Sequence, residues 1–289
     1  MKDKPYTPLT AAPFRKSEAY REMPPLLPEL AAYIRCFWGS EQPFQKKKNA
    51  ALPHLVVPDT CADIIYYVDY TDNMITGRFY GVNDASFPDD DDAGCGHLVS
   101  VFAIRFYAWG VYAFSEDSLK GTMNGCYDVG SRFSRLDAAL RRQLWDTHTL
   151  AERTQAAEAL LWRQMSRLRR SLVVDQAVRQ ILLREGNRQA AELARECFVS
   201  GRQLERLFHE YIGITPKKLC NLVRYQFLWN EIVRNPHFHI AGAAYRYGYA
   251  DQSHLMREFK RYHGMDIRTA KAYAFDFVEN IQDFHNREW

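Results

Sequence analysis

The 289-residue chain has no long apolar run, and its first residues, Met1–Pro5, lead into a polar, proline-rich stretch. A transmembrane helix needs about 18 consecutive apolar residues, whereas the longest apolar runs, Ile64–Val68 and Val99–Phe106, have the size of single strands. A secretory signal peptide would need an apolar segment close to the N-terminus. We therefore expect neither feature, and we predict a cytoplasmic protein.

Paired cysteines are also missing. The chain has no Cys-x-x-Cys spacing, and its six cysteines are scattered, at positions 36, 61, 95, 126, 197 and 220. In a long chain without a signal peptide, this distribution favours reduced thiols over a disulfide framework.

Motifs for metal binding and catalysis are missing as well. Residues of metal-ligand type in the first half lack the paired spacing of a zinc site: His54, Cys61, Cys95 and His97. The acidic run 89–92 lacks the alternation of a calcium loop, and the His-x-His sequence 237–239 is more simply a capping or solvated segment. No P-loop, Gly-x-Ser-x-Gly or His-Glu-x-x-His motif occurs. We expect no metal ion, no cofactor and no catalytic residue, so the chain is predicted not to be an enzyme.

The charge of the chain is small but unevenly distributed. A net charge of +3 results from 38 Lys and Arg against 35 Asp and Glu. Residues 1–150 carry a net charge of −3, and residues 151–289 carry +6. A basic excess in one half points towards nucleic acid or a membrane surface, although it is also common on solvated helical surfaces.

The two halves also differ in their apolar pattern. Residues 31–130 are rich in aromatic and β-branched runs, which predict strands at Tyr33–Trp38, His54–Val57, Ile64–Tyr70, Ile75–Val82 and Leu98–Tyr107. Short strands at such spacing are typical of an antiparallel barrel or sandwich. From residue 131 onward, apolar residues recur at helical spacing instead. We predict an α+β fold of two domains, residues 1–170 with the strands and flanking helices, and residues 171–289 entirely helical.

The helical half contains an internal repeat. Residues 200–213 and 251–264 align at a constant offset of 51 residues, with the same Leu, Arg, Phe, Tyr and Gly positions in both. Such a repeat indicates two copies of one supersecondary unit.

Each copy has the features of a helix-turn-helix unit. Ser200 and Asp251 are suited to cap the start of a helix, and Gly213 and Gly264 stand where that helix would end. Apolar side chains form an inward stripe between them: Leu204, Leu207, Phe208 and Tyr211 in the first copy, and Leu255, Phe259 and Tyr262 in the second. A short Ala-rich helix precedes each cap, at Gln189–Arg195 and Ile240–Arg246. In a helix-turn-helix unit, the second helix enters the major groove of DNA.

The connection between the copies has a suitable length. Residues 217–234 predict one helix of about 27 Å, at a rise of 1.5 Å per residue. B-DNA has a pitch of about 34 Å, so one chain could place both second helices in successive major grooves, over about 20 base pairs.

Polar side chains line the outward faces of both second helices. They are Arg202, Glu205, Arg206 and His209 in the first, and Gln252, Ser253, His254, Arg257 and Lys260 in the second. Arg can bind guanine O6 and N7, Gln can bind adenine N6 and N7, and Glu can accept from cytosine N4. The alternative is an ordinary solvated helix face, which the repetition of both caps disfavours.

These motifs resemble the DNA-binding domain of the AraC/XylS family of transcription regulators, over residues 175–272. The resemblance rests on Ser200–Phe208, Gly213–Pro216 and Gly248–Leu255. The first turn departs from the family pattern, because Cys197–Val199 stands where the family usually has a glycine.

The resemblance implies a sequence-specific regulator that binds a double-stranded DNA operator. Base contacts then fall on Arg202, Glu205 and Arg206 in the helix 201–211, and on Gln252, Ser253, His254 and Arg257 in the helix 252–262. A small-molecule effector of unknown identity and a homodimer are implied with it, and RNA polymerase is a further candidate partner.

The N-terminal half resembles, more loosely, cupin-like β-barrel sensor domains. The similar segments are Tyr33–Trp38, Pro58–Ile65, Tyr80–Val82 and Ala103–Phe106. This resemblance implies effector binding inside the barrel and dimerisation by the adjoining helices. Several aromatic residues either line an apolar pocket or simply form the core: Phe79, Phe102, Phe106, Tyr107, Trp109 and Tyr112. The alternative function is an enzyme or small-molecule-binding protein in which the helical half serves as an interaction module.

Overall fold

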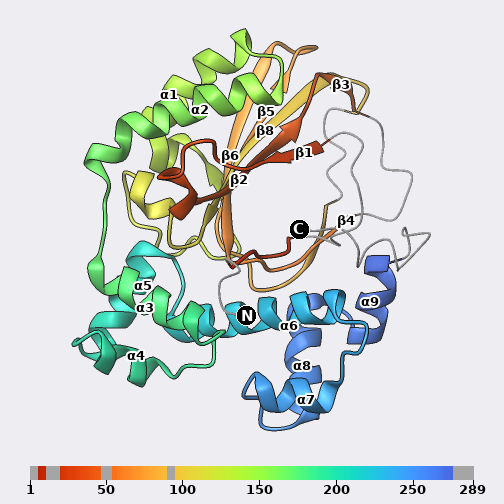
Figure 1. Ribbon diagram of the computed structural model, residues 1–289. Helices are drawn as coiled ribbons and strands as arrows, with labels where there is room; N and C mark the ends of the chain where they lie inside the picture. The colour runs from red at the N-terminus through yellow and green to blue at the C-terminus, as the bar shows by residue number, and fades with distance from the viewer. Residues whose placement is uncertain (1–5, 11–19, 47–53, 90–94, 276–289) are drawn as a thin grey trace.

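The computed structural model describes residues 6–10, 20–46, 54–89 and 95–275, which Figure 1 shows as ribbons. The upper part of the picture contains an antiparallel sheet with two covering helices, and we call it the sheet region (residues 20–167). Helices α3 to α9 form the lower part, which we call the helical region (residues 172–275). The predicted mixed α+β architecture is confirmed.

The main sheet is built around two long strands, β5 (Cys61–Asp69) and β8 (Leu98–Tyr107), which pair along their lengths. Its order is β1-β2-β8-β5-β6-β9, with β3 beside the start of β8 and every pair antiparallel. The remaining strands of this sheet are β1 (Tyr20–Met23), β2 (Ile34–Ser40), β3 (Phe44–Gln45), β6 (Met74–Tyr80) and β9 (Cys126–Asp128). A second sheet pairs β4 (His54–Val56) with β7 (Phe87–Asp89). Each of the five runs predicted as a strand coincides with one.

The antiparallel sheet that was predicted is present, but it does not close into a barrel within the described ranges of the chain. Among the described strands, the edge strands β1 and β9 do not pair with each other, so the main sheet is open. Closure needs strands long enough to keep a continuous, staggered register around the barrel. The two edges have only 4 and 3 residues, and such short edges do not provide it.

One face of the sheet packs against α1 (Gly130–Asp146) and α2 (Leu150–Gln164), which lie side by side over it in Figure 1. Because strand side chains alternate between faces, every second residue of β5 and β8 enters this core, such as Tyr66 and Ile104. The core also contains Phe79, Phe102, Phe106 and Tyr112. These four aromatic residues were predicted either to line a pocket or to form the core, and the structure places them in the core.

The helices of the helical region are arranged around α6 (Pro216–Arg234), which crosses its centre. The pair α4–α5 lies at one end of α6, and the pair α7–α8 lies at the other (Figure 1). The other helices are α3 (Leu172–Leu183), α4 (Ala190–Glu196), α5 (Gly201–Tyr211), α7 (Ile240–Arg246), α8 (Gln252–His263) and α9 (Ile267–Phe275). Short 3-10 helices are η1 (Leu30–Ala32), η2 (Val111–Phe114) and η3 (Met165–Arg167). None of the helices in the described part of the chain is long and apolar enough to cross a membrane.

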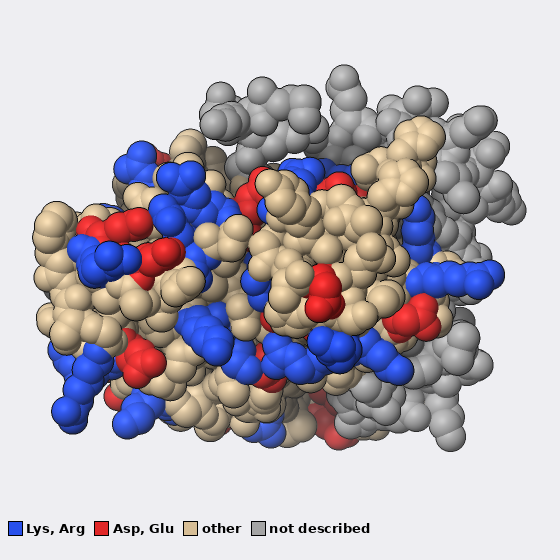
Figure 2. Space-filling model, turned by 90° about the horizontal axis from the view of Figure 1, so that it is seen from below, with Lys and Arg blue, Asp and Glu red and all other residues tan. Residues whose placement is uncertain are grey.

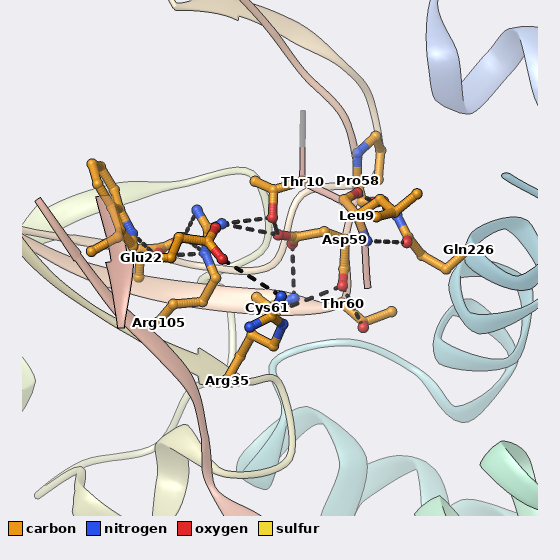
Figure 3. Close-up of polar contacts among 12 residues, drawn as sticks. Leu9, Thr10, Glu22, Arg35, Pro58, Asp59, Thr60, Cys61, Arg105 and Gln226 are labelled. Atoms are coloured by element: carbon orange, nitrogen blue, oxygen red, sulfur yellow. Dashed lines mark hydrogen bonds and ion pairs between the residues drawn. The ribbon is translucent and has the colours of Figure 1, made fainter. Parts of the chain in front are cut away.

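A short N-terminal segment joins the two regions. The backbone of Leu9 donates to Gln226 Oε1 at 2.7 Å and accepts from Gln226 Nε2 at 3.0 Å. On its other side, Thr10 donates to Asp59 Oδ2 at 2.7 Å and accepts from Arg105 Nη1 at 2.6 Å. Figure 3 shows this chain of contacts from the sheet to α6. Residues 9 and 10 therefore connect the start of β5 with the middle of α6.

The core between α6 and α8 contains a histidine that must stay neutral. His263 is 2% exposed, stacks on Phe259, and has its Nδ1 2.8 Å from the hydroxyl of Tyr225. Burial lowers the pKa of His263 from 6.5 to about 4. The unfolded chain therefore binds a proton that the folded chain excludes.

We expect the protein to lose stability as the pH falls from 6.5 towards 4, and to regain it above that window. Between pH 7 and pH 5, the loss due to His263 is about 2 kcal/mol. Urea unfolding at the two pH values measures it, with His263→Phe as the comparison. The variant should lose distinctly less stability on acidification than the parent. Equal losses in parent and variant would show that His263 is not the responsible group.

Candidate nucleic-acid interface

The two predicted helix starts and ends are confirmed. Ser200 Oγ accepts from the backbone N–H of Gln203 at 3.1 Å, and Asp251 Oδ1 accepts from that of His254 at 2.7 Å. Such caps satisfy backbone donors that have no partner inside the helix. The inward stripes are mostly buried, including Leu204 and Phe208 in α5 and Leu255, Phe259 and Tyr262 in α8. Packing therefore fixes which face of each helix points outward.

The turns before α5 and α8 have the same backbone path. Val199 N–H donates to the carbonyl of Ala194, and Tyr249 N–H donates to that of Ala244. Between these partners, Phe198 and Gly248 both have a left-handed backbone, with φ values of 55° and 68°. Phe198 thus occupies the position of the turn glycine, and its side chain is 92% exposed. A non-glycine residue with a left-handed backbone is strained. Phe198 is therefore the departure from the family pattern in the first turn, because it adopts the conformation that a glycine adopts more easily.

All seven residues predicted to contact bases lie on the two outward faces. Arg202, Glu205 and Arg206 are exposed on α5, and Gln252, Ser253 and Arg257 are exposed on α8. His254 is partly buried, because its Nδ1 accepts from the backbone N–H of Ala250 at 3.3 Å and its ring lies edge-on to Tyr249. The structure thus brings the predicted residues together as two sets, one on each helix.

The two faces differ in charge. On α5, Arg202 and Arg206 are balanced by Glu205 and Glu210, and Arg206 Nη1 lies 3.6 Å from Glu210. On α8, the last turn carries the exposed basic residues Lys260 and Arg261, and the acidic side chain of Glu258 is 8% exposed. The face of α8 is therefore the more electropositive one, and we expect it to interact more strongly with phosphate groups.

A partly buried ion pair anchors α8 on α6. Arg224 Nη2 lies 2.7 Å from Glu258 Oε2, and the guanidinium group lies 4.4 Å from the centre of the Tyr249 ring. The two charged side chains are 13% and 8% exposed. Sequence reasoning missed this pair, because Arg224 and Glu258 belong to separate helices and share no recognisable spacing.

The surface that carries both helix pairs is visible from below in Figure 2. Lys and Arg side chains are spread across the whole face, with Asp and Glu between them. Several Lys and Arg side chains adjoin one another in a row across the lower middle of this view, with uncharged areas above and below the row. A surface of this kind has to rely on specific side-chain contacts as well as on its overall charge.

Among the described residues, one group of side chains of metal-ligand type lies close together. Asp69, Asp72 and His97 have ligand atoms within 4.8 Å of one another, and His97 Nδ1 lies 2.7 Å from Asp69 Oδ2. Cys61 is buried and Cys95 is exposed, and residues 90–92 of the acidic run lie outside the described residues.

Two family models match separate parts of the chain. Residues 193–272 match a model described as a helix-turn-helix domain. Residues 21–128 match a model described as a domain of unknown function. The first match covers α5, α6, α7 and α8 together with the end of α4 and the first part of α9. A comparison with curated proteins gives no match.

Several solved structures resemble the chain at low identity. A transcriptional regulator with an AraC-type DNA-binding domain from Chromobacterium violaceum is 20% identical, with a TM-score of 0.33, over 37% of this chain and 95% of that one. The C-terminal domain of AraT, a response regulator from Geobacillus stearothermophilus, is 21% identical, with a TM-score of 0.34, over 36% and 86%. ToxT from Vibrio cholerae O395 is 12% identical, with a TM-score of 0.38, over 84% and 99%.

Proposed function

We propose that this chain, whose residues 193–272 match a helix-turn-helix domain model, is a sequence-specific DNA-binding transcription regulator of the AraC type. In this proposal, α4–α5 and α7–α8 are two helix-turn-helix units, and α5 and α8 enter successive major grooves. We call α5 and α8 the reading helices from here on.

The observation that carries the proposal is the repetition of one exposed, capped helix at both ends of α6. With 19 residues, α6 is about 28 Å long, close to the roughly 34 Å between successive major grooves on one face of B-DNA. Because the inward stripes are buried in the core, the polar faces of both reading helices are available for a partner. A single protomer would then bind an asymmetric site of about two helical turns.

Each predicted contact residue has a role that follows from its hydrogen-bonding groups. Arg202, Arg206 and Arg257 would bind guanine O6 and N7, and Gln252 would bind adenine N6 and N7. Glu205 would accept from cytosine N4. Ser253 and His254 lie in the first turn of α8, where short side chains can reach either a base edge or a phosphate.

We assign the remainder of the chain to effector sensing and dimerisation, with a boundary near residue 170. The sheet region has its own hydrophobic core, separate from the core around α6, which supports this division. We further propose that an effector binds the sheet region, that α1 and α2 contribute to a homodimer, and that RNA polymerase is the target of the bound regulator.

Selection of bound sequences from random DNA tests this function directly. We expect one preferred site, bound at least about a thousandfold more tightly than unrelated DNA at physiological salt. Affinity for both kinds of DNA should fall steeply with salt, with a log–log slope of about −0.9 per phosphate contact, while the preference for the site persists. A protein that selects no sequence, or binds all DNA equally at every salt concentration, would contradict the proposal.

A further inference from the structure

The carboxyl end of the first reading helix is held by the sheet region. The backbone N–H of Leu119 donates to the carbonyl of Glu210 at 2.9 Å. Gly213, just after α5, packs so closely on the same loop that a Cβ there would lie 2.7 Å from Thr122 Oγ1. The last carbonyls of a helix have no partner within it, so the loop supplies a donor that water would otherwise provide.

The second reading helix is held in the same way. The backbone N–H of Ser86 donates to the carbonyl of Tyr262 at 3.0 Å. A Cβ at Gly264, the residue after α8, would lie 2.6 Å from Ser86 Oγ. Both reading helices therefore end against loops of the sheet region, and a glycine permits the close approach in each case.

The two loops are joined to each other. The backbone N–H of Asn124 donates to the carbonyl of Val82 at 3.0 Å, and that of Asp84 donates to Asn124 Oδ1 at 2.9 Å. Asn124 Nδ2 in turn donates to Asp84 Oδ1 at 2.8 Å. We call residues 82–86 and 119–124 together the clamp. Three hydrogen bonds therefore join the two halves of the clamp.

A charged contact fixes the clamp to the helical region between the reading helices. Asp84 forms an ion pair with Lys218, in the first turn of α6. Partial burial raises the pKa of Asp84, but hydrogen bonds from Lys218 and Asn124 outweigh that effect and leave the pKa below its ordinary value. The carboxylate is therefore charged at neutral pH.

A second contact reaches a residue beside the proposed base reader Arg206. The hydroxyl of Tyr112 donates to Glu210 Oε1 at 3.0 Å, and the Tyr112 ring packs on Tyr211 with centroids 3.9 Å apart. Burial and the hydrogen bond to Glu210 raise the pKa of Tyr112, so its hydroxyl keeps the proton that it donates. Glu210 is the carboxylate that lies 3.6 Å from Arg206 Nη1.

We propose that the clamp sets the separation of the two reading helices, so that the sheet region determines which spacing of half-sites the protein accepts on DNA. The inference rests on the proposed function. Asp84, Asn124 and Tyr112 are then positioning residues, which act on DNA recognition through α5 and α8 without contacting DNA themselves. The clamp contacts the carboxyl ends of both reading helices, in addition to the packing of these helices against α6.

The test uses the full-length chain and the preferred site from the selection experiment. The site is remade with one base pair inserted or removed between its halves, and each half is also tested alone. Asp84→Ala removes the ion pair with Lys218 and the hydrogen bond from Asn124 Nδ2, which is one of the three hydrogen bonds between the loops. Tyr112→Phe removes the hydrogen bonds of the Tyr112 hydroxyl with Glu210 and Arg169. Asp146→Ala, at the exposed end of α1, removes a carboxylate far from the clamp and serves as the control.

We expect the parent and Asp146→Ala to favour the original spacing strongly. In Asp84→Ala, the ratio of affinities for original and altered spacing should fall about fivefold or more, while affinity for each half alone stays unchanged. Tyr112→Phe should show a smaller change of the same kind, and because its ring still fills the core it is the safeguard should Asp84→Ala fold poorly. If both variants keep the spacing preference of the parent, the clamp has no such role. A parent without any preferred site would instead overturn the proposed function, and this inference with it.

Discussion

Replacing Arg224 by methionine is expected to lower the free energy of unfolding by about 3 kcal/mol. The substitution leaves the carboxylate of Glu258, 8% exposed, without its main partner. Removing one member of a buried ion pair typically costs about 3–5 kcal/mol, since the other charge stays buried and uncompensated. The lower end applies here because Arg261 Nη2 lies 3.7 Å from Glu258, and His254 Nε2 lies 3.9 Å from it.

Urea unfolding of the full chain measures this effect. The double variant Arg224→Met/Glu258→Leu should regain most of the lost stability, because replacing both charges by apolar groups removes the uncompensated one. Arg268→Met, at an exposed position of α9, controls for the loss of a positive charge and should change stability by less than about 0.5 kcal/mol. If Arg224→Met were as stable as the parent, the pair would contribute nothing to the attachment of α8.

Arg206→Ala and Arg257→Ala are each expected to weaken binding to the preferred site by about 1–3 kcal/mol, which is about 5- to 150-fold in Kd. Both side chains are exposed, so their loss should leave the fold intact. An arginine that binds a guanine also provides discrimination, so each variant should tolerate other bases at one position. Binding to unrelated DNA should fall only slightly.

The control for these variants is Arg179→Ala, which makes the same change of charge at an exposed position of α3, outside both reading helices. It should reduce affinity for all DNA to a small and similar extent. If Arg257→Ala behaved like this control, Arg257 would contact phosphate or solvent, and the proposed reading face of α8 would be wrong.

Features of the helical region that depend on neighbouring residues could be predicted from the sequence. An N-cap side chain accepts from the backbone N–H three residues further along the chain, so Ser200 and Asp251 can be recognised as caps from the nearby sequence alone. The left-handed backbone of Gly264 follows from the same local chemistry. The strained turn at Phe198 could not be predicted, because nothing in the side chain of phenylalanine favours such a conformation.

The sheet region was less accessible to sequence reasoning. In β8, the residues from Val99 to Phe106 are all buried, so the strand shows no alternation that would assign its faces. The aromatic residues Phe102 and Phe106 therefore could not be placed in the core beneath α1 and α2 by pattern alone. Whether a set of strands closes into a barrel depends on register between distant strands, and this also leaves no local signal.

The contacts between the sheet region and the helical region could not be predicted from the sequence. Asp84 and Lys218 are 134 residues apart, and Tyr112 and Glu210 are 98 residues apart. No periodicity or spacing connects such residues in a single sequence. The sequence shows that these side chains are charged or polar, but only the packing of the two regions determines which of them pair.

The central claim is that α5 and α8 read two successive major grooves. Measuring the affinity of the parent, Arg206→Ala and Arg257→Ala for every single-base change in the preferred site tests it most directly. We predict that each variant loses discrimination at one position, and that the two positions lie about one helical turn, or 10–10.5 base pairs, apart. Loss of discrimination in the same half of the site for both variants, or at no position, would contradict the claim.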